Sequence, residues 1–299
     1  MATLYTQADS NIRKTWLLMS VMVILVIGLS WIFSYLLKDR AIFLIGIPIS
    51  ILISFSSYWF SDQLVLSMSG AQLIEKKDNP ELYRIVENLC ITAGLSVPKI
   101  YILNESQPNA FATGRNAQNA VIAVTSGLLE KLDQAELEGV IAHELSHIGN
   151  KDMVLATVIV VMAGVISMLS NQFLRISRWQ SRNRDRDNSS SIVFFAFAIL
   201  AAILAPIAAT LIRLSISRKR EFLADASGAL LTRYPDGLIR ALEKISDDST
   251  PLRVANNATA HLYISNPFKD QQTDSWFVKL FMTHPPIEER VSALKEIKI

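Results

Sequence analysis

Residues 133–152 read DQAELEGVIAHELSHIGNKD and carry the most informative pattern in the chain. Asp133, followed three residues later by Glu136, resembles a capping box, and the apolar positions after it recur with helical spacing. The segment therefore predicts a helix that begins beside Asp133. On that helix His143 and His147 are four residues apart, so their imidazoles project from one face, a turn apart.

The pattern H-E-x-x-H at His143, Glu144 and His147 predicts a zinc site. Imidazoles one helical turn apart can both reach a single Zn²⁺ at about 2.0–2.1 Å. Glu144 follows the first ligand, where its carboxylate can reach a water at the metal without ligating the metal, and it is the expected general base. The alternative is an amphipathic helix with two surface histidines. Against it, the chain has only 4 histidines and two of them fall here.

A catalytic zinc site needs a third protein ligand and keeps a fourth position open. No histidine lies just after His147, so we expect a carboxylate from a second helix. Further along, the chain reads SRKREFLADASGALL, in which Glu221 and Asp225 lie on one helical face. Glu221 is the candidate third ligand, and Asp225 is the candidate acceptor for the N–H of a liganding imidazole. Spacing alone favours the alternative, a surface pair beside neighbouring arginines.

The apolar content of the chain is concentrated in four runs that contain no charged residue. Each run has about 20 residues or slightly more, enough for a helix to cross roughly 30 Å of hydrocarbon. The runs are Thr15–Leu37, Ala41–Ser61, Met153–Leu174 and Ile192–Ile212. Buried core helices are the alternative, which is weakest for the first two runs. The first run exceeds a signal peptide's apolar region and lacks a cleavage site. We therefore predict four transmembrane helices.

Composition supports this class and excludes others. Of 299 residues, 51% are hydrophobic and 19% charged, and the net charge is +2. Mean hydropathy is +0.30. These values exclude a disordered chain and a polycationic nucleic-acid binder. A single cysteine, Cys90, excludes a disulfide scaffold and is expected to be a small buried hydrophobic residue.

The predicted fold is α+β, mostly α, in an integral membrane protein with a zincin-like catalytic domain. The four parts are an N-terminal transmembrane hairpin (1–61), the first part of the catalytic domain (62–152), an inserted transmembrane hairpin (153–212) and the second part of the catalytic domain (213–299). Lys99–Leu103 and Ala120–Thr125 are rich in β-branched residues, which predicts a small antiparallel sheet before the zinc helix. An edge strand there can hold a peptide by main-chain pairing, or it is an ordinary packed strand.

In their order, these motifs resemble the HtpX membrane metalloproteases, integral-membrane gluzincins related to the CAAX prenyl proteases and the Oma-type mitochondrial proteases. The resemblance covers nearly the whole chain, including NAFATG at 109–114, Asn150 and Asp152 after the zinc helix, EFLAD at 221–225, and THPP at 283–286 with Glu289-Arg290. It implies that Glu221 is the third zinc ligand and that Asp225 accepts the N–H of a liganding imidazole. For substrate binding it implies Asn109, Phe111, Ala112 and Val124, and it favours a place near the zinc for His284, whose side chain would stabilise the oxyanion.

The resemblance also implies a function. It predicts an endopeptidase with one Zn²⁺ per chain that cleaves membrane or misfolded proteins near the cytoplasmic membrane surface, in quality control. The predicted location is a bacterial inner membrane, multi-pass, with the catalytic domain facing the cytoplasm. Expected partners are those substrates and the lipid bilayer, without nucleic acid. The positive-inside count is nearly even, and this orientation leaves an Arg-rich linker at 175–190 in the periplasm.

Three other functions were weighed. A non-catalytic membrane scaffold with a structural metal site has no need of Glu144. A CAAX-type processing protease has a larger chain with more predicted spans. A transporter places ionisable groups within its spans, and the four runs contain none.

Overall fold

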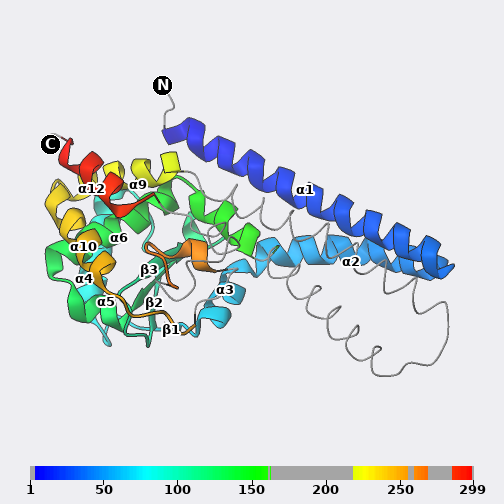
Figure 1. Cartoon of the computed structure of the whole chain (residues 1–299), viewed down its shortest axis with the longest axis horizontal. Helices are drawn as coiled ribbons and strands as arrows, with labels where there is room; N and C mark the ends of the chain where they lie inside the picture. Colours follow the sequence, from blue (N-terminus) through cyan, green and yellow to red (C-terminus); the bar gives the residue numbers. More distant parts are fainter. Residues whose placement is uncertain (1–3, 161, 163–217, 255–258, 269–284, 298–299) are drawn as a thin grey trace.

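The structure, a computed structural model, describes residues 4–160, 162, 218–254, 259–268 and 285–297. It shows a head of helices packed around a small sheet, from which a long pair of helices projects (Figure 1). The helices of the head are α3 (Ser61–Ser69), α4 (Pro80–Ala93), α5 (Ser126–Lys131), α6 (Gln134–Gly149), α9 (Arg218–Thr232), α10 (Pro235–Asp247) and α12 (Ile287–Lys295), with 3-10 turns η1 (Ala117–Asn119) and η2 (Ala260–Leu262).

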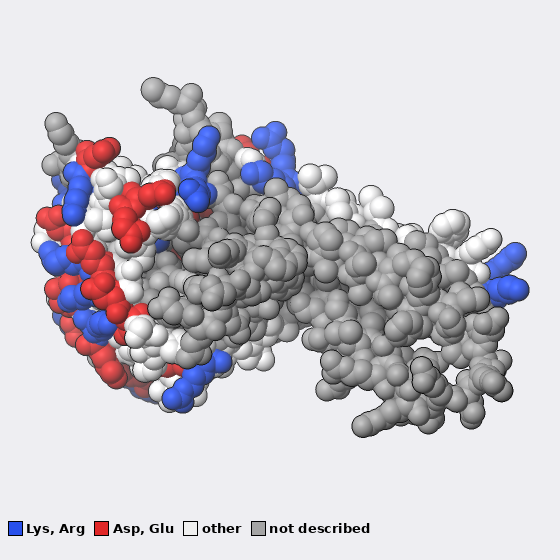
Figure 2. Space-filling view, in the orientation of Figure 1, with Lys and Arg blue, Asp and Glu red and all other residues white. Residues whose placement is uncertain are grey.

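The projecting pair consists of α1 (Leu4–Leu37) and α2 (Arg40–Trp59), which lie side by side (Figure 1). A Cβ added at Gly46 of α2 would lie 2.0 Å from the Ser30 hydroxyl of α1, so a glycine is needed for this close approach. Exposed Arg13 and Lys14 lie at the head end of α1. Figure 2 shows acidic and basic side chains gathered over the head, and uncharged described surface between the head end of the pair and its far tip. That tip is the turn between the two helices, where exposed Lys38 and Arg40 lie.

Only part of the four predicted apolar runs lies within the described residues. Among the described residues, one helix, over Asp9–Gly28, is long and apolar enough to cross a membrane, and a shorter apolar helix covers Arg40–Ser56. The third predicted run begins as helix at residues 152–160. The rest of that run, the fourth run and the Arg-rich linker lie outside the described residues, so four spans remain a prediction.

The sheet has four strands in the order β1-β2-β4-β3. The strands are β1 (Gln72–Leu73), β2 (Lys99–Leu103), β3 (Ala110–Thr113) and β4 (Val121–Thr125). The bounds of β2 match the prediction, and β4 differs from its prediction by one residue. The prediction of an antiparallel sheet was wrong, because β2 pairs with β4 in parallel while β1–β2 and β3–β4 are antiparallel.

The reason for the mixed pairing is the short strand β3. The predicted loop between β2 and β4 contains it, and its presence reverses the chain twice before β4 begins. Two reversals leave β2 and β4 pointing the same way, and β3 then pairs with the far side of β4. Strand β3 thus forms one edge of the sheet and contacts α6.

Helix α6 begins where the sequence predicts. The Asp133 side chain accepts from the backbone N–H of Glu136, and the Glu136 carboxylate accepts from the backbone N–H of Asp133, which completes the capping box. Glu136 is 1% exposed and also accepts from Lys244 of α10 at 2.7 Å. The cap therefore also ties α6 to α10. Cys90 is free and buried, as predicted.

The packing of α6 against α9 controls the position of the metal-binding motif. A Cβ added at Gly228 of α9 would lie 3.0 Å from the backbone nitrogen of His143 and 3.2 Å from its Cα. Gly228 is two helical turns beyond Glu221, on the same face. Because only a hydrogen occupies this point of contact, the backbone of α9 can approach α6 closely enough for Glu221 to reach both histidines.

Replacing Gly228 with valine is expected to force α9 away from α6. Overpacking of this kind typically costs about 1–3 kcal/mol in the free energy of unfolding, and the protein should also bind less metal. Chemical denaturation and metal analysis of the purified protein measure both effects. Leu230→Gln, at a position of α9 that is 60% exposed, is the control and should change stability by no more than about 0.5 kcal/mol. A Gly228→Val protein as stable and as metal-loaded as wild type would contradict this packing argument.

Candidate metal centre

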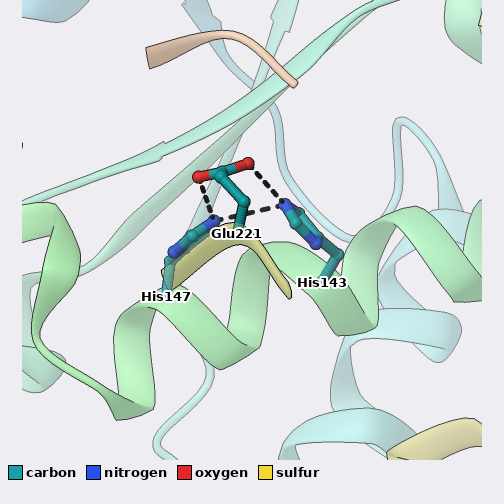
Figure 3. Close-up of side chains that lie close together, drawn as sticks. All are labelled: His143, His147 and Glu221. Carbon is teal, nitrogen blue, oxygen red and sulfur yellow. Dashed lines mark hydrogen bonds and ion pairs between the residues drawn. The ribbon is translucent and has the colours of Figure 1, made fainter. Parts of the chain in front are cut away.

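Three side chains converge between α6 and α9: His143, His147 and Glu221 (Figure 3). The Nε2 atoms of the two histidines are 3.2 Å apart. One oxygen of Glu221 lies 3.6 Å from Nε2 of His147, and the other lies 4.0 Å from Nε2 of His143. Ligands of a tetrahedral zinc ion are about 3.3 Å from one another. The spacing of the three groups therefore fits one small divalent ion.

A carboxylate lies behind each of the two imidazoles. Nδ1 of His143 lies 2.9 Å from an Asp225 oxygen, and Nδ1 of His147 lies 3.1 Å from an Asp152 oxygen. A proton kept on each Nδ1 by the neighbouring carboxylate would direct both Nε2 lone pairs inward. Two inward lone pairs and a carboxylate repel one another unless a proton or a metal ion lies between them. The donor set thus fits a metal ion.

Asp225 supports His143 and is itself held by an arginine. Nε of Arg290 donates to Oδ2 of Asp225 at 2.8 Å, and Nη2 donates to Oδ1 at 2.6 Å. Arg290 is 0% exposed and Asp225 is 2% exposed. Burial alone would raise the pKa of Asp225, but the charge and hydrogen bonds of Arg290 lower it to about 2. The carboxylate therefore stays ionised and keeps its hold on the imidazole.

Asp152 supports His147 because of a turn at the end of α6. Lys151 has a positive φ of 57°, which reverses the chain directly after the helix. Asp152, 6% exposed, is thereby folded back against the ring of His147. Sequence reasoning quoted Asp152 and Arg290 as parts of motifs without giving either a role. A polar residue directly after the helix that carries the histidines was the available signal for Asp152.

The surroundings of His147 are strongly negative. Burial would lower its pKa, but the hydrogen bond to Asp152 and the charges of Glu221, Asp152 and Glu144 raise it to about 9. The same carboxylates that favour a proton on this ring favour a divalent cation beside it. Glu144 is 2% exposed and lies on α6 next to His143. The centre therefore combines three candidate ligands with the buried carboxylate of Glu144.

The structure brings together four of the residues predicted for the zinc site and its support: His143, His147, Glu221 and Asp225. Glu144 adjoins them along α6. His284 lies outside the described residues.

The predicted substrate-binding residues lie at or beside strands β3 and β4. The Asn109 side chain is buried and accepts from the backbone N–H of Ser265 at 3.3 Å. Phe111, on β3, packs edge-on against Tyr263, with ring centroids 5.2 Å apart. Val124 lies in β4, which is paired on both sides, so the backbone of β4 has no edge left for a peptide. Main-chain pairing is therefore possible at β3 and not at the strand near Val124.

Residues 76–298 match the model of Peptidase family M48. The chain belongs to peptidase family M48. A protease HtpX homolog of Dictyoglomus turgidum is 42% identical over 98% of this chain and 94% of its own. One of Pyrococcus furiosus is 46% identical over 95% of each chain. A solved structure, Ste24p of S. mikatae, is similar with a TM-score of 0.48 and 21% identity, over 94% of this chain and 66% of that one.

Membership of M48 agrees with the geometry of the centre. The predicted resemblance to HtpX proteases is confirmed, and the chain is a metalloendopeptidase that acts on protein substrates. A family of metallopeptidases implies a bound metal, and the cluster of His143, His147 and Glu221 can hold one.

Arg290→Met tests the support of His143. It leaves the Asp225 carboxylate buried without its cation, which typically costs about 3–5 kcal/mol in the free energy of unfolding. Arg218→Met is the matched control, because Arg218 pairs with Glu289 at 3.8 Å with both side chains largely exposed. Pairs of that kind contribute about 0–1 kcal/mol. Chemical denaturation of both variants measures the free energy of unfolding. Equal losses of stability in the two variants would contradict the larger contribution expected of the buried Arg290–Asp225 pair.

Proposed function

We propose that the protein is a zinc-dependent endopeptidase of the membrane that cleaves membrane or misfolded proteins near the cytoplasmic membrane surface. The observation that carries this proposal is the convergence of two imidazoles and one carboxylate, with buried Glu144 beside them and outside the ligand set. Two nitrogen ligands with one oxygen ligand are the donors of catalytic zinc sites, and three protein ligands leave a position for water or substrate.

In this proposal the residues of α6 and α9 divide the work. A bound zinc ion supplies a Lewis acid that makes water acidic near neutral pH and polarises the peptide carbonyl. Glu144 accepts the proton of the attacking water as the new C–O bond forms. It then delivers this proton to the amine nitrogen as the C–N bond breaks. Asp225 and Asp152 keep the imidazoles oriented throughout. His284 is proposed as a donor to the oxyanion.

The outer edge of β3 is proposed as the substrate-binding strand. Thr125 donates to the carbonyl of Asn109 on the inner side, so by alternation the backbone groups of Ala110 and Ala112 point outward. The N–H of Ile264 already donates to the carbonyl of Ala110, whereas no described residue pairs with the backbone of Ala112. A peptide added at Ala112 would lie beside α6, which contacts β3. Main-chain pairing of this kind selects an extended segment with weak preference for its sequence.

The surface of the α1–α2 pair supports a place in the membrane. Large apolar side chains point outward along it, among them Ile24 at 69% exposed and Leu44 at 66% exposed. Trp16 stacks on Tyr58 near the head, and Trp31 stacks on Tyr35 near the far tip. From Trp16 to Trp31 the rise along α1 is about 23 Å at 1.5 Å per residue, and from Trp16 to Tyr35 it is about 28 Å. That matches a hydrocarbon layer of roughly 30 Å between aromatic belts.

The family resemblance supports the proposed location, number of spans, orientation and physiological role. We propose a bacterial inner membrane, four spans, and a catalytic domain in two parts (62–152 and 213–299) that faces the cytoplasm. Substrates would be loops or tails of membrane proteins, including damaged ones, and the physiological role would be quality control. The α1–α2 pair joins the head close to the metal centre, where Asn11 of α1 contacts Asp152. A substrate within reach of the centre would therefore also be close to the membrane surface.

Glu144→Gln tests the catalytic role directly. The substitution removes the proton acceptor while leaving all three ligands, so peptide cleavage should fall by about 10²–10⁴-fold with metal content unchanged. Glu138→Gln, also on α6 and hydrogen-bonded only to Gln134 among the described residues, is the control and should cleave like wild type. Cleavage of a membrane-protein fragment by the detergent-purified proteins gives the rates. Equal rates in Glu144→Gln and wild type would contradict the catalytic role of Glu144 and favour a non-catalytic membrane scaffold with a structural metal site.

Glu221→Ala tests the third ligand. Loss of one of three protein ligands should lower both the zinc content and the rate of cleavage, and added zinc should restore at most part of the activity. Zinc content and proteolysis are measured on the same preparation, with a chelator-treated wild-type sample as reference. Retained zinc together with full cleavage would show that Glu221 is not a ligand.

A further inference from the structure

A side chain of the projecting helix pair reaches the metal centre. Nδ2 of Asn11, on α1, donates to Oδ1 of Asp152 at 2.7 Å and to the backbone carbonyl of Asn150 at 3.1 Å. Asn11 is 1% exposed, and Asp152 is the carboxylate whose other oxygen lies 3.1 Å from Nδ1 of His147. A continuous line of contacts therefore runs from α1 through Asp152 to His147.

The two histidines are supported in different ways. On the His143 side, Asp225 is held by two short, charged hydrogen bonds from Arg290, which belongs to the head. On the His147 side, the arginine contact is longer: Nη1 of Arg220 lies 3.4 Å from Oδ1 of Asp152. The shorter hydrogen bond to Asp152 comes from Asn11. The head thus holds Asp225 by itself, whereas Asp152 is held jointly by Arg220 of the head and by Asn11 of α1.

The position of Asn11 also fixes the turn that brings Asp152 back to His147. Its two hydrogen bonds go to residues on either side of Lys151, which has the left-handed backbone conformation. A non-glycine residue in that conformation is unfavourable by itself and needs support from its surroundings. A single amide group bridging Asn150 and Asp152 provides such support from outside α6.

We propose that Asn11 is a positioning residue for the metal centre, which acts through Asp152 to hold His147 in its ligating orientation. The first helix of the projecting pair is then part of the metal site as well as a membrane anchor. Metal affinity would therefore depend on how α1 is seated on the head. This inference rests on the proposed zinc site and concerns the same centre.

The test compares two substitutions on α1 in the full-length, detergent-purified protein. Asn11→Leu keeps the approximate shape and removes both donors. Thr15→Val is the matched control, because Thr15 is 3% exposed, lies one turn further along α1, and donates only to the carbonyl of Asn11 in its own helix among the described residues. Zn²⁺ dissociation constants come from chelator competition, and the thermal unfolding of the metal-free proteins reports the fold.

Asn11→Leu should raise the Zn²⁺ dissociation constant roughly tenfold, the low end of the range for groups that support a ligand. Thr15→Val should leave it unchanged. The d–d absorption of the Co²⁺-loaded protein should change in Asn11→Leu only, because the orientation of one imidazole is altered. If Asn11→Leu does not fold, Asn11→Ser replaces it, since a serine hydroxyl is too short to bridge Asn150 and Asp152. An unchanged dissociation constant in the folded variant would overturn the proposal.

A double-mutant cycle separates positioning from general damage. In an Asp152→Ala background, Asn11→Leu should change the Zn²⁺ dissociation constant by less than about twofold, because the path to His147 is already broken. A full tenfold effect in that background would show that Asn11 does not act through Asp152. The wild-type measurement distinguishes the two proposals: a wild-type protein that binds no divalent ion sinks the zinc site itself, whereas tight wild-type binding with no effect of Asn11→Leu sinks only this inference.

Discussion

The mutual approach of α6 and α9 is the contact on which the metal centre depends. Gly228 lets the backbone of α9 come against His143, and two turns earlier on the same face Glu221 meets both imidazoles. Because Asp225 and Asp152 lie beside the Nδ1 atoms, both Nε2 atoms face the Glu221 carboxylate. This arrangement concentrates negative charge in a buried place. A divalent cation relieves it, which is why the packing of two helices amounts to a metal site.

The carboxylates behind the histidines connect the centre to different parts of the molecule. Asp225 is paired with fully buried Arg290, so α6, α9 and α12 are joined through one guanidinium. Asp152 instead receives its short hydrogen bond from Asn11 of α1. One imidazole is thus backed by contacts within the head alone, and the other by Asp152, which both Arg220 of the head and Asn11 of α1 contact. The catalytic and membrane parts are therefore not independent units joined by a linker.

The sheet contributes an edge beside this centre. Strand β3 lies outermost and contacts α6, while β4 is paired on both sides. The segment around Ile264 covers the beginning of the β3 edge, since it donates to Ala110. In the proposed function, an extended peptide would pair further along the strand, at Ala112. The mixed order of the strands follows from the two chain reversals around β3, and it is this order that makes β3 an edge strand.

Local geometry allowed the sequence alone to determine much of the site. His143 and His147 share a face because any helix places residues four apart together, and the capping box at Asp133 depends on residues three apart. Composition also marked the apolar runs, and the described residues contain one helix, over Asp9–Gly28, that is long and apolar enough to cross a membrane. Only the tertiary structure decided what is distant in the chain: the meeting of Glu221 with the histidines, the parallel pairing of β2 with β4, and the contact of Asn11 with Asp152. Their partners are brought together by packing, which no local period or propensity encodes.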